Sequence, residues 1–128
     1  MNQILMNNLS LLIGTLLQSR NQAQIYHWQT KGLGSGQAHL ALQAYYEGII
    51  PLIDELVESY QGKYGILYGY KMAGTLREDG AHVMYFDGLC RFMTAIKPSL
   101  PQDTYLQNQY DEIETLIQTT KYKLVNLQ

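Results

Sequence analysis

Two histidines flank a short glycine-rich segment in the N-terminal half of the sequence. His27 ends an amphipathic stretch in YHWQTKG, and His39 follows just beyond GLGSG. A short turn between two helices puts the end of one beside the start of the next, so both imidazoles are expected at the same end of a helix pair. Neutral imidazole is the commonest protein ligand for metals. The two histidines therefore predict half of a metal site, although histidines near a turn also occur incidentally.

Carboxylates share one face of the expected second helix with His39. On a wheel of 100° per residue, Glu47, Asp54 and Glu58 fall within about 100° of His39 and away from the apolar stripe. No Lys or Arg occurs between residues 32 and 62, so no cation stands one turn from these acids. This face predicts either a set of metal ligands or the solvated side of an amphipathic helix.

The spacing of these residues excludes a site within one chain. His39 and Asp54 are separated by about 22 Å if one helix carries both. A second copy packed antiparallel about a two-fold axis would bring Asp54 and Glu58 to His27 and His39 of the first copy. Symmetry would then create two such sites. The pattern predicts a homo-oligomer built on a two-fold dimer.

The elements that position these residues are four helices, because no segment has the alternation typical of a strand. Ser35 is the expected N-cap of the second helix, and Thr75-x-x-Glu78 is a capping box for the third. Pro51 lies inside the second helix, where it is expected to kink or restart it. The four predicted helices cover residues 2–29, 36–61, 75–97 and 101–128.

The connections between these helices predict the topology. The first and third are short and should join antiparallel neighbours. The middle one, GKYGILYGYKMAG, can extend about 40 Å and return along the bundle. We therefore expect a single all-α domain over residues 1–128, a ferritin-like four-helix bundle with one long crossover between helices two and three. A plain up-down bundle with a loose loop is the alternative.

Composition excludes several classes of protein. The net charge is −2 without a basic run, which argues against nucleic-acid binding. No apolar run could span a bilayer and no secretion signal is evident. The lone Cys90 excludes an internal disulfide and suits a reducing compartment, so a cytoplasmic location is expected. The chain has eleven tyrosines and only 16% charged residues, which suits either a protein interface or a monomer with partly buried tyrosines.

Residues 20–62 resemble the Dps-like miniferritins. HWQTKG matches their His-Trp pair and Lys-Gly turn, His39 their second histidine, and DELVE their acidic pair. The resemblance implies an inter-subunit di-iron ferroxidase centre and a hollow dodecamer that stores oxidised iron. Its implied iron ligands are His27, His39, Asp54 and Glu58, with Trp28 beside them in a redox role. Short proteins encoded in tailed-phage genomes look similar in YHWQTKG and ESYQGKYG.

The sequence departs from this family at several points. Gln43 stands where the family has a bridging aspartate, and Glu47, one turn on, is the residue that could replace it. The C-terminal helices look short for the family. No basic DNA-binding tail is present.

Three functions therefore stay open. The first is a Dps-like ferroxidase that binds ferrous iron at a mononuclear or di-iron centre, oxidises it and sequesters the product. The second is a phage-encoded, ferritin-like binding or structural module without ferroxidase activity, whose partner would be a host or virion protein or a small ligand. The third is a mononuclear zinc protein that uses His27 and His39. Loss of iron oxidation in Asp54→Ala would single out the first.

Overall fold

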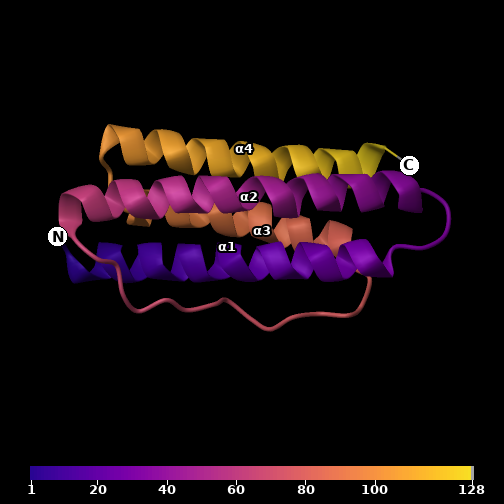
Figure 1. Ribbon diagram of the computed structural model, residues 1–128, viewed down its shortest axis with the longest axis horizontal. Coiled ribbons are helices and arrows are strands. Elements are labelled where there is room, and N and C mark those ends of the chain that lie inside the picture. Colours follow the sequence, from indigo (N-terminus) through magenta and orange to yellow (C-terminus); the bar gives the residue numbers. More distant parts are fainter. Residues whose placement is uncertain (128) are drawn as a thin grey trace.

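The computed structural model describes residues 1–127 as a bundle of four α-helices (Figure 1). No strand occurs in this range, and the expected all-α fold is confirmed at this level. No helix described here combines the length and the apolar character that a membrane crossing requires. The helices are α1 (Gln3–Gln29), α2 (Ser35–Tyr64), α3 (His82–Ile96) and α4 (Thr104–Asn126).

Apolar stripes from all four helices form one core. α1 packs mainly on α2, α2 on α4, and α3 on α4. α1 and α2 run antiparallel, as do α3 and α4, which agrees with the short turns that join them (Figure 1). Each helix contributes fully buried side chains, represented by Leu12, Leu42, Phe86 and Ile113.

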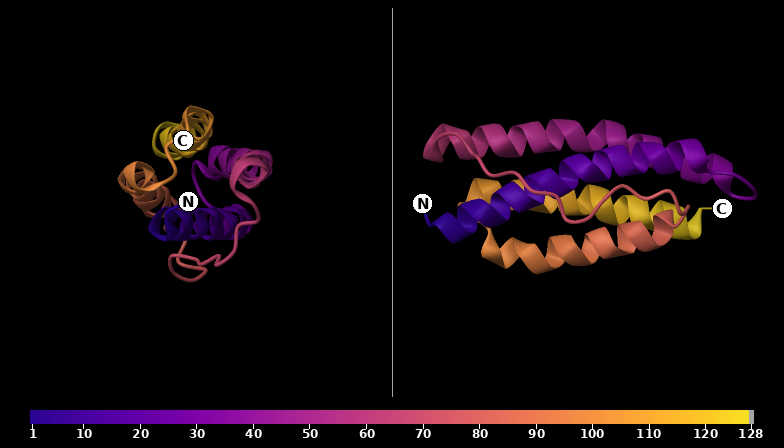
Figure 2. Two further views of the ribbon diagram at one scale, coloured as in Figure 1. Left: turned by 90° about the vertical axis from the view of Figure 1, so that its left-hand side faces the viewer. Right: turned by 90° about the horizontal axis from the view of Figure 1, so that it is seen from below.

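Residues 65–81, which we call the strap, connect α2 to α3 without any helical turn. The strap crosses the outer side of α1 obliquely, from one end of the bundle toward the other (Figures 1 and 2). α3 then runs in the same direction as α2. The strap therefore places residues 77–81 beside the C-terminal part of α1, near the end of the bundle where His27 ends α1 and His39 begins α2.

One face of α1 is built to hold the strap. Gln22 bonds the backbone of Arg77 twice: its Nε2 donates to the carbonyl at 2.8 Å and its Oε1 accepts from the amide at 2.6 Å. Ser10 Oγ donates to the Tyr68 carbonyl at 2.6 Å. These bonds satisfy backbone groups that no helix or strand pairs. Five buried residues follow one another at intervals of four along this face, and all of them are small or carry a polar group. They are Ser10, Gly14, Gln18, Gln22 and Tyr26.

Three expectations about the helices differ from the structure. The third helix starts at His82, and residues 75–78, the expected capping box, belong to the strap. Two hydrogen bonds from Gln22 hold this stretch extended at Arg77, so tertiary contacts override the local pattern. Ser35 is the first helical residue of α2, and its N-cap is Gly34. α2 also continues through Pro51, so the expected restart does not occur. The carbonyl left without a donor belongs to Glu47, four residues earlier, and Glu47 is exposed, so this carbonyl lies where water can bond it.

Candidate metal centre

The end of α1 and the start of α2 bring His27 and His39 together. His27 lies in the last turn of α1 and His39 in the second turn of α2. In the tight connection between them, Gly32 and Gly34 have φ angles of 85° and 81°, which glycine adopts without strain. The two glycines therefore allow the chain to reverse within a few residues.

The two imidazoles are stacked, and each is fixed by the backbone of the other residue. Their ring centroids are 3.5 Å apart with 23° between the planes. Nδ1 of His27 donates to the carbonyl of His39 at 2.8 Å, and Nδ1 of His39 donates to the carbonyl of His27 at 3.1 Å. Because a carbonyl only accepts, both Nδ1 atoms carry a proton. In the neutral rings each Nε2 then keeps a lone pair, as in an imidazole that binds a metal ion.

The surroundings leave the histidine pair open on one side. His27 is buried, with 7% of its surface exposed, whereas His39 is exposed. The ring of Tyr46 stands edge-on to His27 at 5.4 Å, and the Arg20 guanidinium lies 5.2 Å from the centre of the Tyr46 ring. An ion would therefore approach the pair from the side of His39.

The expected acidic ligands lie elsewhere on α2. Glu47, Asp54 and Glu58 are exposed, and none of them forms an ion pair within residues 1–127. Gln43 Nε2 donates to Glu47 Oε1 at 3.0 Å. Because α2 is continuous, Asp54 lies about 22 Å along the helix from His39. In the described part of the chain, no three His, Cys, Asp or Glu side chains form a group that could hold a metal ion. One chain thus joins only His27 and His39.

Trp28 is 68% exposed and lines a separate hollow. This hollow has a volume of about 540 Å³, and Glu78, Asp79 and Gly80 of the strap also line it. Although Trp28 follows His27 in the chain, its side chain lies at a surface that α1 shares with the strap.

The interior of the bundle is not equipped for a metal ion. Tyr45 and Ser19, both fully buried, share a hydrogen bond at 2.6 Å, and Ser19 Oγ also donates to the Leu16 carbonyl. Burial raises the pKa of Tyr45 far above its usual value, so its hydroxyl stays protonated. No Asp or Glu belongs to the buried residues of the range 1–127. Among residues 1–127, the interior around Tyr45 therefore offers hydroxyl groups and no carboxylate.

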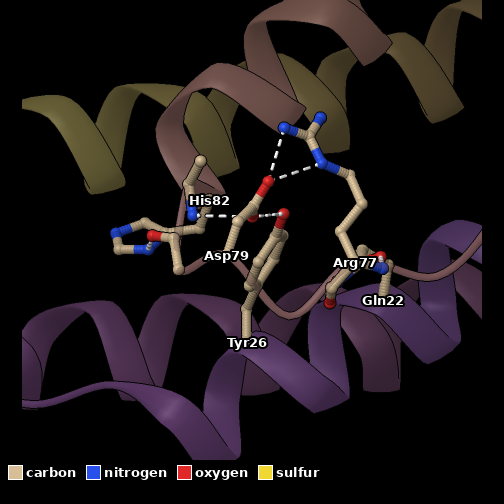
Figure 3. A network of polar contacts seen from close by, with 7 residues as sticks. Gln22, Tyr26, Arg77, Asp79 and His82 are labelled. Atoms are coloured by element: carbon tan, nitrogen blue, oxygen red, sulfur yellow. Dashed lines mark hydrogen bonds and ion pairs between the residues drawn. The ribbon is translucent and has the colours of Figure 1, made fainter.

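A second polar cluster, which sequence reasoning missed, fastens the end of the strap to α1 (Figure 3). Tyr26 Oη donates to Asp79 Oδ1 at 2.9 Å, and Arg77 pairs with Asp79 Oδ2 at 2.6 Å. Burial and the bond to Asp79 raise the pKa of Tyr26 to about 12. The Ala81 amide, Tyr26 and Arg77 lower the pKa of Asp79 to about 2. Tyr26 therefore stays protonated and Asp79 ionised near neutral pH, which suits an anchor and not an acid-base pair.

Comparison with known protein families gives a match. A family model described as "Family of unknown function (DUF5856)" matches residues 27–124, a range that contains both histidines and the acidic face of α2. Neither the curated proteins nor the solved structures contain a match to this chain.

Proposed function

The chain belongs to the family of unknown function DUF5856, and we propose that it is a Dps-like, ferritin-like protein that binds and oxidises ferrous iron between two copies. In this proposal His27 and His39 of one copy and Asp54 and Glu58 of the other hold the iron. Iron is the substrate, and the oxidised product is sequestered by the assembled oligomer.

The reciprocal bonds of His27 and His39 carry this proposal. Histidines that bind metals usually donate their second ring N–H to a carbonyl or carboxylate, which fixes the tautomer and the orientation of the ring. Each of these two imidazoles has such a partner in the carbonyl of the other residue. The exposure of His39 gives an ion from solvent a way to the pair.

Asp54 and Glu58 are the ligands that we assign to the second copy. They lie one turn apart on an exposed face that has no cation of its own. Like charges at this spacing repel each other, and a bound cation would relieve that repulsion. Two imidazoles with two carboxylates form a donor set that suits iron. The length of α2 between His39 and Asp54 is the reason why the partner has to be antiparallel.

The proposed reaction is a one-electron oxidation of each iron. Two ferrous ions give two electrons to one hydrogen peroxide, the O–O bond breaks, and two hydroxide ions form. The chain contributes the binding groups, and its carboxylates favour the higher charge of the ferric product. Gln43, which replaces an aspartate of the Dps-like family, orients Glu47 through its amide. Trp28 keeps the redox role that the resemblance implies.

The course of the chain supports the ferritin-like part of the proposal. Two antiparallel helix pairs, α1 with α2 and α3 with α4, are joined by a strap that runs along the bundle (Figure 1). One long connection between two such pairs is the arrangement of ferritin-like bundles.

A mixing experiment tests whether two copies share the site. One variant carries His27→Gln and His39→Gln, and the other carries Asp54→Asn and Glu58→Gln. Circular dichroism first establishes that both fold, and they are then unfolded and refolded together. In a mixed two-fold dimer one site regains all four ligands and the other has none. We expect each variant alone to be inactive, and the equal mixture to regain about a quarter of wild-type iron oxidation. A mixture that exchanges subunits without regaining activity contradicts the shared site.

A second candidate is a binding module without ferroxidase activity. The observation that favours it is the outward row of apolar side chains on the strap, formed by Ile66, Tyr68, Tyr70, Met72 and Leu76. Exposed apolar rows of this kind are typical of protein contacts. Normal folding and assembly without any response to iron would support this candidate over the first.

A further inference from the structure

A groove separates the strap from α3, on the side of the bundle away from α2. It has a volume of about 390 Å³, within the range of small-molecule sites. Its walls are largely apolar and come from Met84, Tyr85, Leu89 and Phe92 of α3. Neither His27 nor His39 lines it, so the groove is distinct from the candidate metal centre.

Gly88 is the feature of this groove that packing does not explain. It lies in the interior of α3, where glycine costs about 1 kcal/mol relative to alanine. A Cβ added at Gly88 meets no atom within 4 Å in the described chain, and its φ is not positive. Gly48 of α2, by comparison, would place a Cβ 3.4 Å from Leu116. The space at Gly88 therefore belongs to the groove and not to a helix contact.

The charged groups of the lining are both cations. Arg77 of the strap and Arg91 of α3 line the groove, and no Asp or Glu does. Their carboxylate partners, Asp79 and Asp87, lie outside this lining. Arg91 contacts Asp87 through one nitrogen at 3.1 Å, which leaves most of its N–H donors free. Arg77 is already paired with Asp79 through two nitrogens, so the remaining N–H donors of Arg91 are the ones that an anionic group in the groove would meet.

We infer that this groove binds a small organic anion, with an aromatic or aliphatic body over Gly88 and an acidic group at Arg91. The body would pack against Met84, which is 70% exposed, and Phe92, which is half-buried, and removing their surface from water favours an apolar ligand. The anion would accept charge-assisted hydrogen bonds from the guanidinium. This site is independent of the proposed iron chemistry and does not require a second copy.

The test uses two fluorescent probes that differ by one charged group. 8-Anilinonaphthalene-1-sulfonate carries an anionic sulfonate, and N-phenyl-1-naphthylamine is its neutral counterpart. Each is titrated into wild type, Gly88→Leu and Arg91→Gln. Gly62→Leu is the matched control, because Gly62 also lies in a helix and also has open space around it. Thermal denaturation and circular dichroism establish that all variants are folded.

We expect saturable binding of both probes to wild type and to Gly62→Leu. Gly88→Leu fills the groove and should lower the affinity for both probes about tenfold or more. Arg91→Gln should weaken the sulfonate about three- to fivefold and leave the neutral probe unchanged. Absence of saturable sulfonate binding to wild type would overturn the proposal. So would equal affinity in Gly88→Leu and Gly62→Leu, or an equal effect of Arg91→Gln on both probes.

Discussion

The missing side chain of Gly14 makes room for the backbone of Lys71. A Cβ built on Gly14 would lie 2.0 Å from the Lys71 carbonyl oxygen, well inside contact distance. The strap therefore rests directly on α1 near the middle of its course. Only glycine permits so close an approach of two backbones.

Gly14→Ala should push the strap away from α1. We expect the free energy of unfolding to fall by about 1–3 kcal/mol through overpacking, although alanine alone favours a helix by about 1 kcal/mol. Hydrogen exchange should accelerate at the Ala73 amide, which is bonded to Thr15 Oγ1. Gly62→Ala is the control, because its added Cβ meets nothing within 4 Å in the described chain. Equal stability of the two variants would contradict this account of the strap.

Gln22→Glu should also loosen the strap. The change removes the donor to the Arg77 carbonyl and sets an oxygen against it, while the Arg77 amide keeps its acceptor. The lost bond is partly buried, so we expect a cost of about 1 kcal/mol, at the lower end of the range for an acceptor without its partner. Chemical denaturation measures the difference, with Gln118→Glu on the exposed face of α4 as control. The prediction fails if the two variants lose the same stability.

Much of the helical architecture could be predicted from the sequence, because its signals are local. α1 begins and ends within a residue of the expected range, since a leucine stripe and the glycine turn mark it. The start of α3 could not be predicted in the same way. It depends on contacts of the strap with Gly14 and Gln22, which are far away in the sequence. The repeat of small or polar residues at intervals of four, from Ser10 to Tyr26, is the feature of the sequence that indicates where the strap packs. A pattern of apolar residues alone does not include it.

In the candidate site, too, the features with a local signal could be predicted and those that depend on distant contacts could not. His27 and His39 could be expected together because a single turn joins them. The Tyr26–Asp79 bond links α1 to the strap and has no local signal. The role of Asp54 and Glu58 depends on a second copy, whose position the sequence of one chain does not specify.

Asp79 should make the stability of the strap depend on pH. The pKa of Asp79 is lowered from 3.8 to about 2 by the Ala81 amide first, and then by Tyr26 and Arg77. A carboxyl whose pKa is lower in the folded state stabilises that state fully at a pH above the pKa of the unfolded chain. This stabilisation is lost as the pH falls through the pKa of the folded state. The destabilisation caused by Asp79→Asn should therefore shrink between pH 4 and pH 2.

Thermal denaturation across this range measures that change. The effect should be small, because 42% of the Asp79 side chain is exposed. Asp54→Asn is the control, since Asp54 is exposed and has no ion pair among residues 1–127. A destabilisation by Asp79→Asn that is the same at pH 2 and pH 7 would show that the ionised carboxylate is not the anchor.

The most direct measurement is an anaerobic calorimetric titration of the metal-free protein with ferrous iron. Wild type is compared with His39→Gln, which keeps a donor for the His27 carbonyl but lacks the imidazole nitrogen. His82→Gln is the matched control. His82 also bonds a backbone carbonyl, that of Gly80, but it lies beside the Tyr26–Asp79 cluster and not at the histidine pair. We predict binding near micromolar affinity, about −8 kcal/mol, for wild type and His82→Gln, and none for His39→Gln. Absence of binding to wild type, or unchanged binding to His39→Gln, would contradict the claim that these two imidazoles form an iron site.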